Sequence, residues 1–167
     1  MKRITACLVT LVSLSLAAAG AAVESSWSDL NRQVIEMYQK KYYSKAIPVA
    51  QKALDLAEST YGSDSPETVL ALNNLAMLYK KTKRYKAAEP LYKRALTISE
   101  RLAGPNHPDL AVPLNNLAMY YQARKNYAKA YEFSLRAISI LEKAYGPKHP
   151  YVIQAHERFE AMKRGRS

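Results

Sequence analysis

The sequence predicts an all-α protein in which three helical hairpins and one capping helix stack into a right-handed α-solenoid. Two observations carry this prediction. The hexapeptide Leu72–Met77 returns without change 42 residues later as Leu114–Met119. A glycine-containing loop also recurs, at Gly62, Gly104 and Gly146, with the same interval of 42 residues. A fixed period of this length is typical of proteins whose units stack so that each contacts its neighbours.

The composition fits one helical domain with a core of its own. The chain has 167 residues, of which 49% are hydrophobic, and it contains only 5 Gly. This balance leaves little room for a loop-rich or disordered chain. Tyr is frequent (13 residues) while Phe (2) and Trp (1) are scarce, which favours helix packing through amphipathic rings.

The first 22 residues have the three parts of a secretory signal peptide. The basic pair Lys2–Arg3 precedes an apolar stretch, Ile4–Leu16, and the small residues Ala17–Ala22 follow it. We expect cleavage near Ala22, or at Ala19, and export to the periplasm or the medium. An uncleaved membrane anchor is the alternative, but the apolar stretch is shorter than the roughly 20 residues that span a bilayer.

Cleavage would leave a basic chain without cysteine. Cys7, the only cysteine, lies in the signal segment, so the mature chain would have no thiol, disulfide or cysteine metal site. Loss of Lys2 and Arg3 lowers the formal net charge from +11 to +9. For an exported protein, this charge favours acidic proteins, phospholipid headgroups or anionic polysaccharide as partners, and no nucleic acid is expected.

The first unit shows the order of elements that the later units repeat. Apolar and alanine residues at helical spacing predict helices over Ser28–Lys41 and Tyr43–Tyr61. Gly62 is expected to close the second helix in the left-handed conformation. Ser65 as N-cap and Pro66 at the first helical position then predict a new helix, to about Thr82.

Recurrence of this loop sets the expected boundaries of the units. They are a signal peptide at 1–22, repeats at about 26–63, 64–105 and 106–147, a capping helix at 149–164 and a basic tail at 165–167.

The positions that recur resemble a known repeat family. In the second unit they are Leu72, Leu75, Ala76, Tyr79, Tyr85, Ala88, Tyr92 and Ala95. This pattern closely resembles the tetratricopeptide repeat, and the third unit matches it. The first unit departs from it at Gln33 and Val34, where the later units have Leu-Ala. The 42-residue period is similar to the longer repeats of the kinesin light chain type, although no motor function follows from that.

The resemblance implies a peptide-binding groove lined by the first helix of each unit. In that family, Asn side chains of this face bind extended peptide backbones, and an amide suits this role because it both donates and accepts hydrogen bonds. An alternative is that one Asn of each pair is a packing residue, and which Asn faces the groove is left open. By position, the expected peptide-binding residues are Asn31, Arg32, Asn73, Asn74, Met77, Lys80, Lys81, Asn115, Asn116, Met119 and Gln122.

Basic residues gather at the turn between the two helices of every unit. Stacking should bring these turns to one edge of the solenoid and form a basic edge there. Such charges are often merely solvated; an acidic partner or an anionic surface is the functional alternative. The residues are Lys40, Lys41 and Lys45, then Lys80, Lys81, Lys83, Arg84 and Lys86, then Arg124, Lys125 and Lys129.

Neither a metal site nor a catalytic motif is indicated. His107 and His149 each precede a Pro that opens a helix, so capping or loop packing explains them. With His156 they make three His without Cys and without a recurrent carboxylate partner, which is a poor metal site. The sequence lacks a phosphate-binding Gly loop, a nucleophile elbow and a HExxH motif. We therefore expect no cofactor and no enzymatic activity.

The sequence thus predicts an exported, non-enzymatic adaptor that binds a protein or peptide partner, as an extended and acidic segment, in its groove. The alternative is a cell-envelope binder whose basic edge contacts anionic lipid or polysaccharide, with weak association to an anionic membrane surface. An enzyme or metal protein is the third and least favoured hypothesis.

Overall fold

The computed structural model describes residues 27–165, and within them it confirms the predicted all-α solenoid. The signal peptide and its cleavage site lie outside the described residues. The described chain forms a first helix over 27–39, then α2 (Tyr43–Tyr61), α3 (Pro66–Lys81), α4 (Tyr85–Ala103), the 3-10 turn η1 (Pro108–Leu110), α5 (Ala111–Ala123), α6 (Tyr127–Tyr145) and α7 (Pro150–Arg164).

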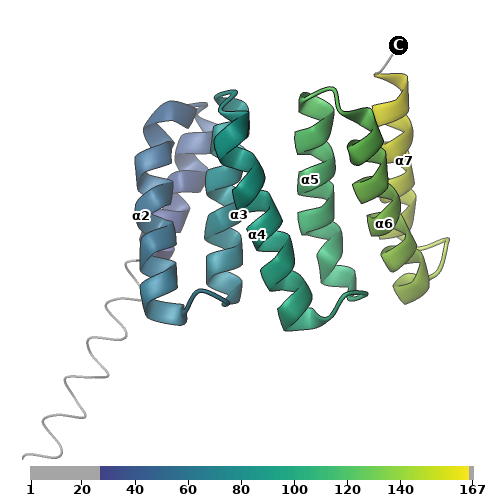
Figure 1. Cartoon of the computed structure of the whole chain (residues 1–167), viewed down its shortest axis with the longest axis horizontal. Helices are drawn as coiled ribbons and strands as arrows, with labels where there is room; N and C mark the ends of the chain where they lie inside the picture. Colours follow the sequence, from purple (N-terminus) through teal and green to yellow (C-terminus); the bar gives the residue numbers. More distant parts are fainter. Residues whose placement is uncertain (1–26, 166–167) are drawn as a thin grey trace, which may run out of the picture.

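The helices alternate between two layers (Figure 1). The first-helix layer consists of the helix over 27–39, α3, α5 and α7; the second-helix layer consists of α2, α4 and α6. Arginine–glutamate ion pairs join neighbours within the second-helix layer: Arg94 pairs with Glu58, and Arg136 lies 2.6 Å from Glu100. Both pairs span 36 positions, so the same contact recurs one repeat later.

The connections lie at two opposite edges of the molecule (Figure 1). The turn rim, at the upper edge, holds the short turns at 40–42, 82–84 and 124–126, together with the C-terminal end of α7. The loop rim, at the lower edge, holds the connections at 62–65, 104–110 and 146–149. Each repeat therefore presents its two connections in the same direction as the repeat before it.

Alanines at the helix crossings bring the layers close together. Ala46, Ala88 and Ala130 occupy equivalent positions 42 residues apart, and each has a solvent exposure of 0%. Such small side chains allow adjacent helices to approach closely.

The core divides into two clusters. One contains residues of α2, α3 and α4 with Val34, and the other extends from α3 and α4 to α7. The half-buried Tyr79 and Leu91 pack against both clusters, so they mark the seam between them.

The loop rim confirms most of the predicted capping signals. The Ser65 hydroxyl accepts a hydrogen bond from the Thr68 N–H over 3.1 Å, and Pro66 holds the first helical position. The Nδ1 atoms of His107 and His149 accept backbone N–H groups two residues on, each over 3.3 Å, as expected for capping histidines.

The glycine conformation at this rim differs from the prediction. Gly62 and Gly104 have the positive φ of 92° that favours glycine, but their ψ of 159° is extended rather than left-handed helical. The Gly62 N–H still closes α2 on the Glu58 carbonyl, while the extended ψ carries the chain on toward the next cap.

The third repeat begins less regularly than the second. It starts with η1, and α5 follows from Ala111. Pro113 explains the difference, because without an N–H it cannot close an α-helical turn on the carbonyl of Asp109.

The last helix packs on α6 through Val152, Ala155 and Met162, which are buried, while Tyr151 and Ile153 on it are exposed. Among the described residues, no helix is long and apolar enough to cross a membrane.

Candidate functional site

The first-helix layer carries three hollows that involve predicted peptide-binding residues. One of about 310 Å³ lies between α3 and α5 and is lined by Asn73. A second of about 350 Å³ lies between α5 and α7 and is lined by Asn115. These two hollows repeat each other, since the lining residues Leu70 and Asn73 of the first correspond to Val112 and Asn115 of the second.

The third hollow brings together three predicted residues of one helix. It measures about 430 Å³ and lies farther along α5 and α7. Asn115, Met119 and Gln122 line it from α5, and Arg158 and Met162 line it from α7. The Met119 side chain is 52% exposed and so is accessible there.

Asparagine side chains connect successive first helices. The Asn74 Nδ2 donates a hydrogen bond to the Asn31 Oδ1 over 2.8 Å, and the Asn116 Nδ2 donates one to the Asn73 Oδ1 over 3.1 Å. Both bonds join residues 43 positions apart. We call this series the asparagine ladder. Its hydrogen bonds occupy some of the amide donors and acceptors that were expected to bind a peptide.

The asparagines of the ladder differ in how many side-chain hydrogen-bonding groups remain free for a ligand. Asn73 is a packing residue, because its Nδ2 also donates to the Val69 carbonyl over 3.0 Å, so both ends of its amide are bonded. Asn74 and Asn116 use a donor each and keep their Oδ1 atoms. Within the described chain, the Asn115 side chain makes no hydrogen bond, which leaves a complete amide at the hollows.

The next ladder position falls on an arginine that the sequence analysis did not select. Counting 43 residues from Asn115 gives Arg158, and both residues line the same two hollows between α5 and α7. Arg158 is exposed and has no ion-pair partner among the described residues. Arg158 also lies 42 residues after Asn116, so it holds the position in α7 that Asn74 and Asn116 hold in α3 and α5, with an arginine in place of the asparagine.

The predicted basic residues of the first two units have different surroundings. Arg32 forms an ion pair with Asp29 of its own helix. Lys80 is half-buried without an acidic partner among the described residues; burial, reinforced by the charge of Lys81, lowers the pKa of Lys80 to about 8. The Lys81 ammonium lies 5.7 Å from the centre of the Tyr38 ring, at the turn rim. Met77 is half-buried on α3.

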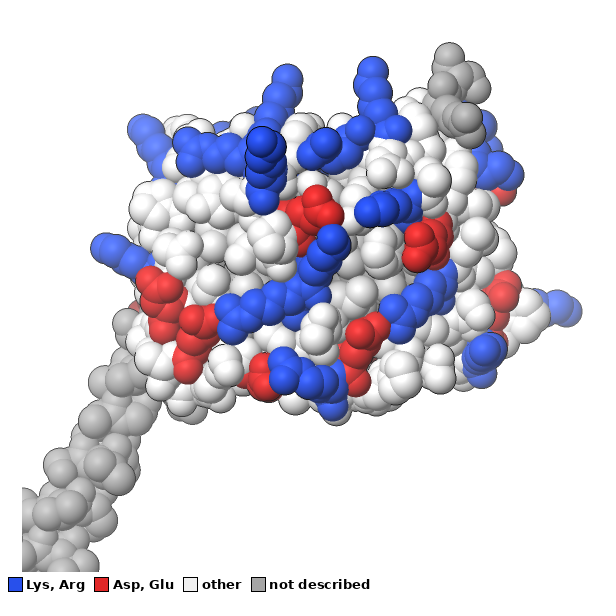
Figure 2. All heavy atoms as spheres, viewed as in Figure 1, with Lys and Arg blue, Asp and Glu red and all other residues white. Residues whose placement is uncertain are grey.

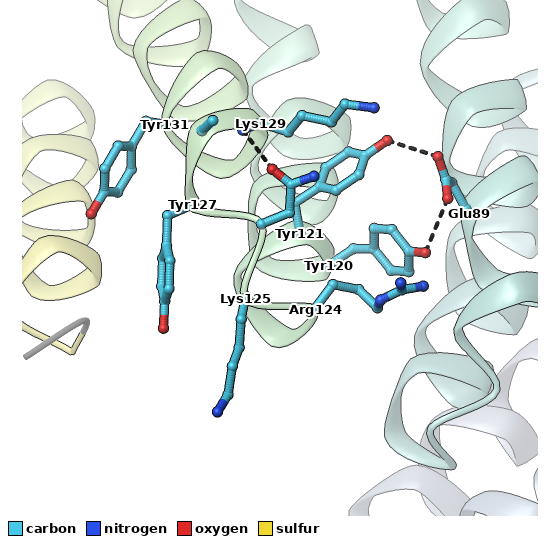
Figure 3. Close-up of a pocket in the computed structure, with 10 residues that line it drawn as sticks. Glu89, Tyr120, Tyr121, Arg124, Lys125, Tyr127, Lys129 and Tyr131 are labelled. Atoms are coloured by element: carbon cyan, nitrogen blue, oxygen red, sulfur yellow. Dashed lines mark hydrogen bonds between the residues drawn. The ribbon is translucent and has the colours of Figure 1, made fainter.

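A further hollow, of about 840 Å³, surrounds the α5–α6 turn at the turn rim (Figure 3). On one side of it, the Tyr121 and Tyr120 hydroxyls donate to the two carboxylate oxygens of Glu89 over 2.8 and 3.2 Å. The Lys93 ammonium lies 2.7 Å from the same carboxylate. Hydrogen bonds from Lys93 and then Tyr121 lower the pKa of Glu89 to about 2, so this carboxylate is ionised and fully engaged.

The charges that remain at this hollow are positive. They belong to Arg124, Lys125 and Lys129 (Figure 3). A smaller hollow of about 470 Å³ lies one repeat earlier and shares Arg124, with Lys83, Arg84 and Lys86 around it. Figure 2 shows basic side chains along the whole upper edge of the molecule, as the sequence predicts.

Comparisons with known proteins identify the repeat. The tetratricopeptide repeat model matches residues 33–101, 71–130 and 109–160, which together cover most of the chain. None of the curated proteins matches.

Solved structures show the same fold. BtubC (BKLC) from P. vanneervenii is 22% identical, with a TM-score of 0.73 over 84% of this chain and 57% of its own. The nearly identical TPR-like repeats described as those of a kinesin light chain from Podosopora anserina are 18% identical, with a TM-score of 0.72 over 83% of this chain and 67% of theirs. A form of these repeats with one substitution is 17% identical, with a TM-score of 0.71 over 83% of this chain and 66% of its own.

Proteins with this fold typically serve as non-enzymatic scaffolds that bind other proteins. The repeat pattern, the alternating layers and the match over residues 33–160 agree: the chain belongs to the tetratricopeptide repeat family, with repeats like those of kinesin light chains.

Proposed function

We propose that the protein is an exported, non-enzymatic adaptor that binds an extended, acidic peptide segment along its first-helix layer. One observation carries this proposal. The Asn115 amide and the Arg158 guanidinium lack partners in the described chain, and both line the two hollows between α5 and α7. Unpaired polar groups beside hollows are the usual features of a site that fixes a ligand by a few hydrogen bonds.

The first-helix layer has groups that can bind the backbone, the side chains and the carboxylates of such a peptide. The Asn115 amide can donate to a peptide carbonyl and accept from a peptide N–H, and the free Oδ1 atoms of Asn74 and Asn116 can accept further N–H groups. The hollows between successive first helices receive side chains. Arg158 supplies the paired N–H donors that suit a carboxylate.

Lys80 also favours an acidic segment. Its ammonium is partly desolvated and lies near a second positive charge. A carboxylate brought close to it would restore the missing favourable interaction and raise the pKa of Lys80 toward its ordinary value.

A peptide array tests the proposal. The full chain is applied to immobilised peptides, each about 15 residues long to span the layer in extended form, of graded Asp and Glu content. The variants N115A and R158A are compared with N73A. We expect N115A and R158A each to reduce binding to acidic peptides about tenfold or more, with unchanged helical circular dichroism. N73A, at a residue bonded within the ladder, should lose less binding than N115A, because its amide is not free for the peptide. K52Q, at an exposed lysine of α2, is the control and should bind as wild type. Equal binding by wild type, N115A and R158A would contradict the groove proposal.

Export has a separate test. Mass spectrometry of the protein from cell-envelope and medium fractions should find a mature N-terminus close to residue 23. An intact N-terminus in those fractions would instead support the retained anchor.

An envelope binder that uses the basic turn rim is the second candidate. The observation in its favour is the row of cations at that rim, of which the proposed peptide site uses only Lys80.

A further inference from the structure

Each turn of the turn rim has a lysine in a backbone conformation that favours glycine. The φ angles of Lys41, Lys83 and Lys125 are 61°, 60° and 58°, and the three residues lie 42 positions apart. After each lysine, the next N–H bonds to the carbonyl five residues earlier, for example Arg84 to Tyr79 over 2.8 Å. This is the helix-closing motif in which glycine, or else asparagine, normally takes the left-handed position.

The lysines are therefore not explained by the turn itself. A side chain on a left-handed residue meets steric conflict that glycine avoids. In this chain the conflict recurs in all three turns with the same residue type, and each lysine side chain is exposed at the tip of its turn. A strained position that recurs in this way indicates a role for the side chain.

Aromatic rings accompany the cations at this rim. The amino group of Lys45 lies 5.6 Å from the centre of the Tyr42 ring, the Arg124 guanidinium carbon lies 5.6 Å from that of Tyr85, and the Lys129 amino group lies 5.1 Å from that of Tyr121. Lys81 lies over Tyr38 and Tyr43, and Lys163 lies over Phe159 at the end of α7. Cations over ring faces are held in place while their charge stays accessible.

Acidic residues do not offset this charge. The segments 38–47, 80–88 and 122–131 contain three, five and three basic residues and no Asp or Glu. Glu89, which follows the second segment, is already bonded to Lys93, Tyr120 and Tyr121. No ion pair joins a cation of these three described segments to an acidic residue, so the turns form a row of uncompensated cations along the solenoid (Figure 2). At the C-terminal end of α7, Lys163 is instead paired with Glu160 over 3.0 Å.

The shape of this row favours a flat surface over a linear partner. Basic side chains line the upper edge, some projecting upward and others lying along the surface (Figure 2). This edge holds the turn of every repeat (Figure 1). A planar array of anions can meet all of these cations at once. Tyrosine side chains are enriched at the level of the lipid headgroups, and lysine side chains are attracted to anionic headgroups.

We propose that the turn rim docks the protein on an anionic phospholipid bilayer. The helices then stand roughly perpendicular to the membrane, with the turns at the headgroups and the loop rim away from them. This orientation leaves the first-helix layer open at the side. Docking through the lysines at the tips of the turns does not need Lys80, the rim residue assigned to the peptide. The proposal makes the second candidate function specific and does not rest on the proposed adaptor function.

Vesicle sedimentation tests the proposal with the full chain. Vesicles of phosphatidylcholine with about 30 mol% phosphatidylglycerol, roughly one anion in three lipids, are compared with pure phosphatidylcholine vesicles in about 0.1 M NaCl. The neutral vesicles report any binding through the apolar N-terminal segment. The difference between the two vesicle types measures the electrostatic contribution.

The decisive variant is K41N/K83N/K125N. Asparagine tolerates the left-handed conformation, so the turns should keep their shape, and circular dichroism checks this. Because each lysine near an anionic surface strengthens binding about fivefold, the triple variant should bind anionic vesicles about a hundredfold more weakly. The matched control, K52Q/K143Q/K148Q, removes three exposed lysines that lie away from the turn rim and should lose far less binding.

Three results would overturn the proposal. They are unchanged vesicle binding by the rim variant, an equal loss in the control variant, and binding that does not weaken between about 0.1 and 1 M NaCl, where screening shortens from about 10 to about 3 Å. Alginate, an acidic polysaccharide, serves as the alternative ligand. If the rim variant loses alginate binding but keeps vesicle binding, the rim is a polysaccharide site. Peptide-array binding by the rim variant should stay at the wild-type level, so failure of docking can be told from failure of the groove.

Discussion

The Asn116 side chain donates a hydrogen bond to the Asn73 side chain over 3.1 Å, across the boundary between two repeats. The Asn73 amide also donates a hydrogen bond to the Val69 carbonyl of its own helix, α3. Asn73 and Asn115, which occupy the same position in two successive repeats, therefore have different roles. Asn73 holds α3 and α5 together, whereas Asn115 faces the hollows with its amide unbonded within the described chain.

The difference predicts unequal effects on stability. N73A removes the acceptor of Asn116 and leaves that half-buried amide without its partner, so it should lower the free energy of unfolding by about 1–2 kcal/mol. N115A breaks no hydrogen bond and should change it by less than about 0.5 kcal/mol. Urea unfolding followed by circular dichroism measures both. Equal losses would contradict the assignment of the two roles.

Glu89 predicts a loss of stability in acid. Its pKa of about 2 in the folded protein lies below the ordinary 4.5, so the ionised carboxylate stabilises the fold above about pH 4.5. That contribution is lost as the pH falls through 4.5 toward 2. Because the side chain is 31% exposed, we expect only about 1–2 kcal/mol after allowing for solvent screening. The difference in unfolding free energy between wild type and E89Q should reach this value near neutral pH and shrink as the pH approaches 2; a constant difference would be inconsistent with the lowered pKa.

Lys80 predicts a cost to stability that disappears at high pH. Its folded pKa of about 8 lies below the ordinary 10.5, so the unfolded chain binds more protons between these values and the folded state is penalised below pH 8. K80M should therefore raise the unfolding free energy by about 1–3 kcal/mol near neutral pH. The advantage should fade as the pH rises from 8 to 10.5. Denaturant titrations across this range check the prediction, and a gain that grows with pH would refute it.

A larger side chain at Ala130 should destabilise the packing where two helices cross. Ala130 is fully buried between layers, whereas Ala128, which lies earlier on α6, is exposed. A130L should lower the unfolding free energy by about 1–3 kcal/mol through overpacking. A128L is the control and should stay within about 0.5 kcal/mol of wild type. Thermal and urea unfolding measure both effects. Similar effects of the two substitutions would contradict the prediction, because they would mean that a larger side chain fits at the helix crossing.

Features that depend on one repeat could be predicted from the sequence. The bounds of α2, the capping role of Ser65 and the basic turns follow from local spacing and local hydrogen-bonding chemistry. The first-helix layer was harder to predict, because contacts between neighbouring repeats join residues 43 positions apart, not 42. That shift of one residue rotates the partner by about 100° around the helix. Asn115 differs from Asn73 because the residue 43 positions after it is Arg158 and not an asparagine, and this contact between repeats is visible only in the folded chain.

Tyr79 and Leu91 pack against both clusters of the core, so their position has a consequence for partial unfolding of the solenoid. Because each hairpin of a repeat array depends mainly on its neighbours, we expect the two clusters to unfold as two coupled cooperative units joined at this seam. Amide hydrogen exchange should be slowest where α3 and α4 meet at that seam and faster toward α7. A partner that bridges α3 and α5 would lock both units together, and so would suppress partial opening of the array more than its contact area suggests.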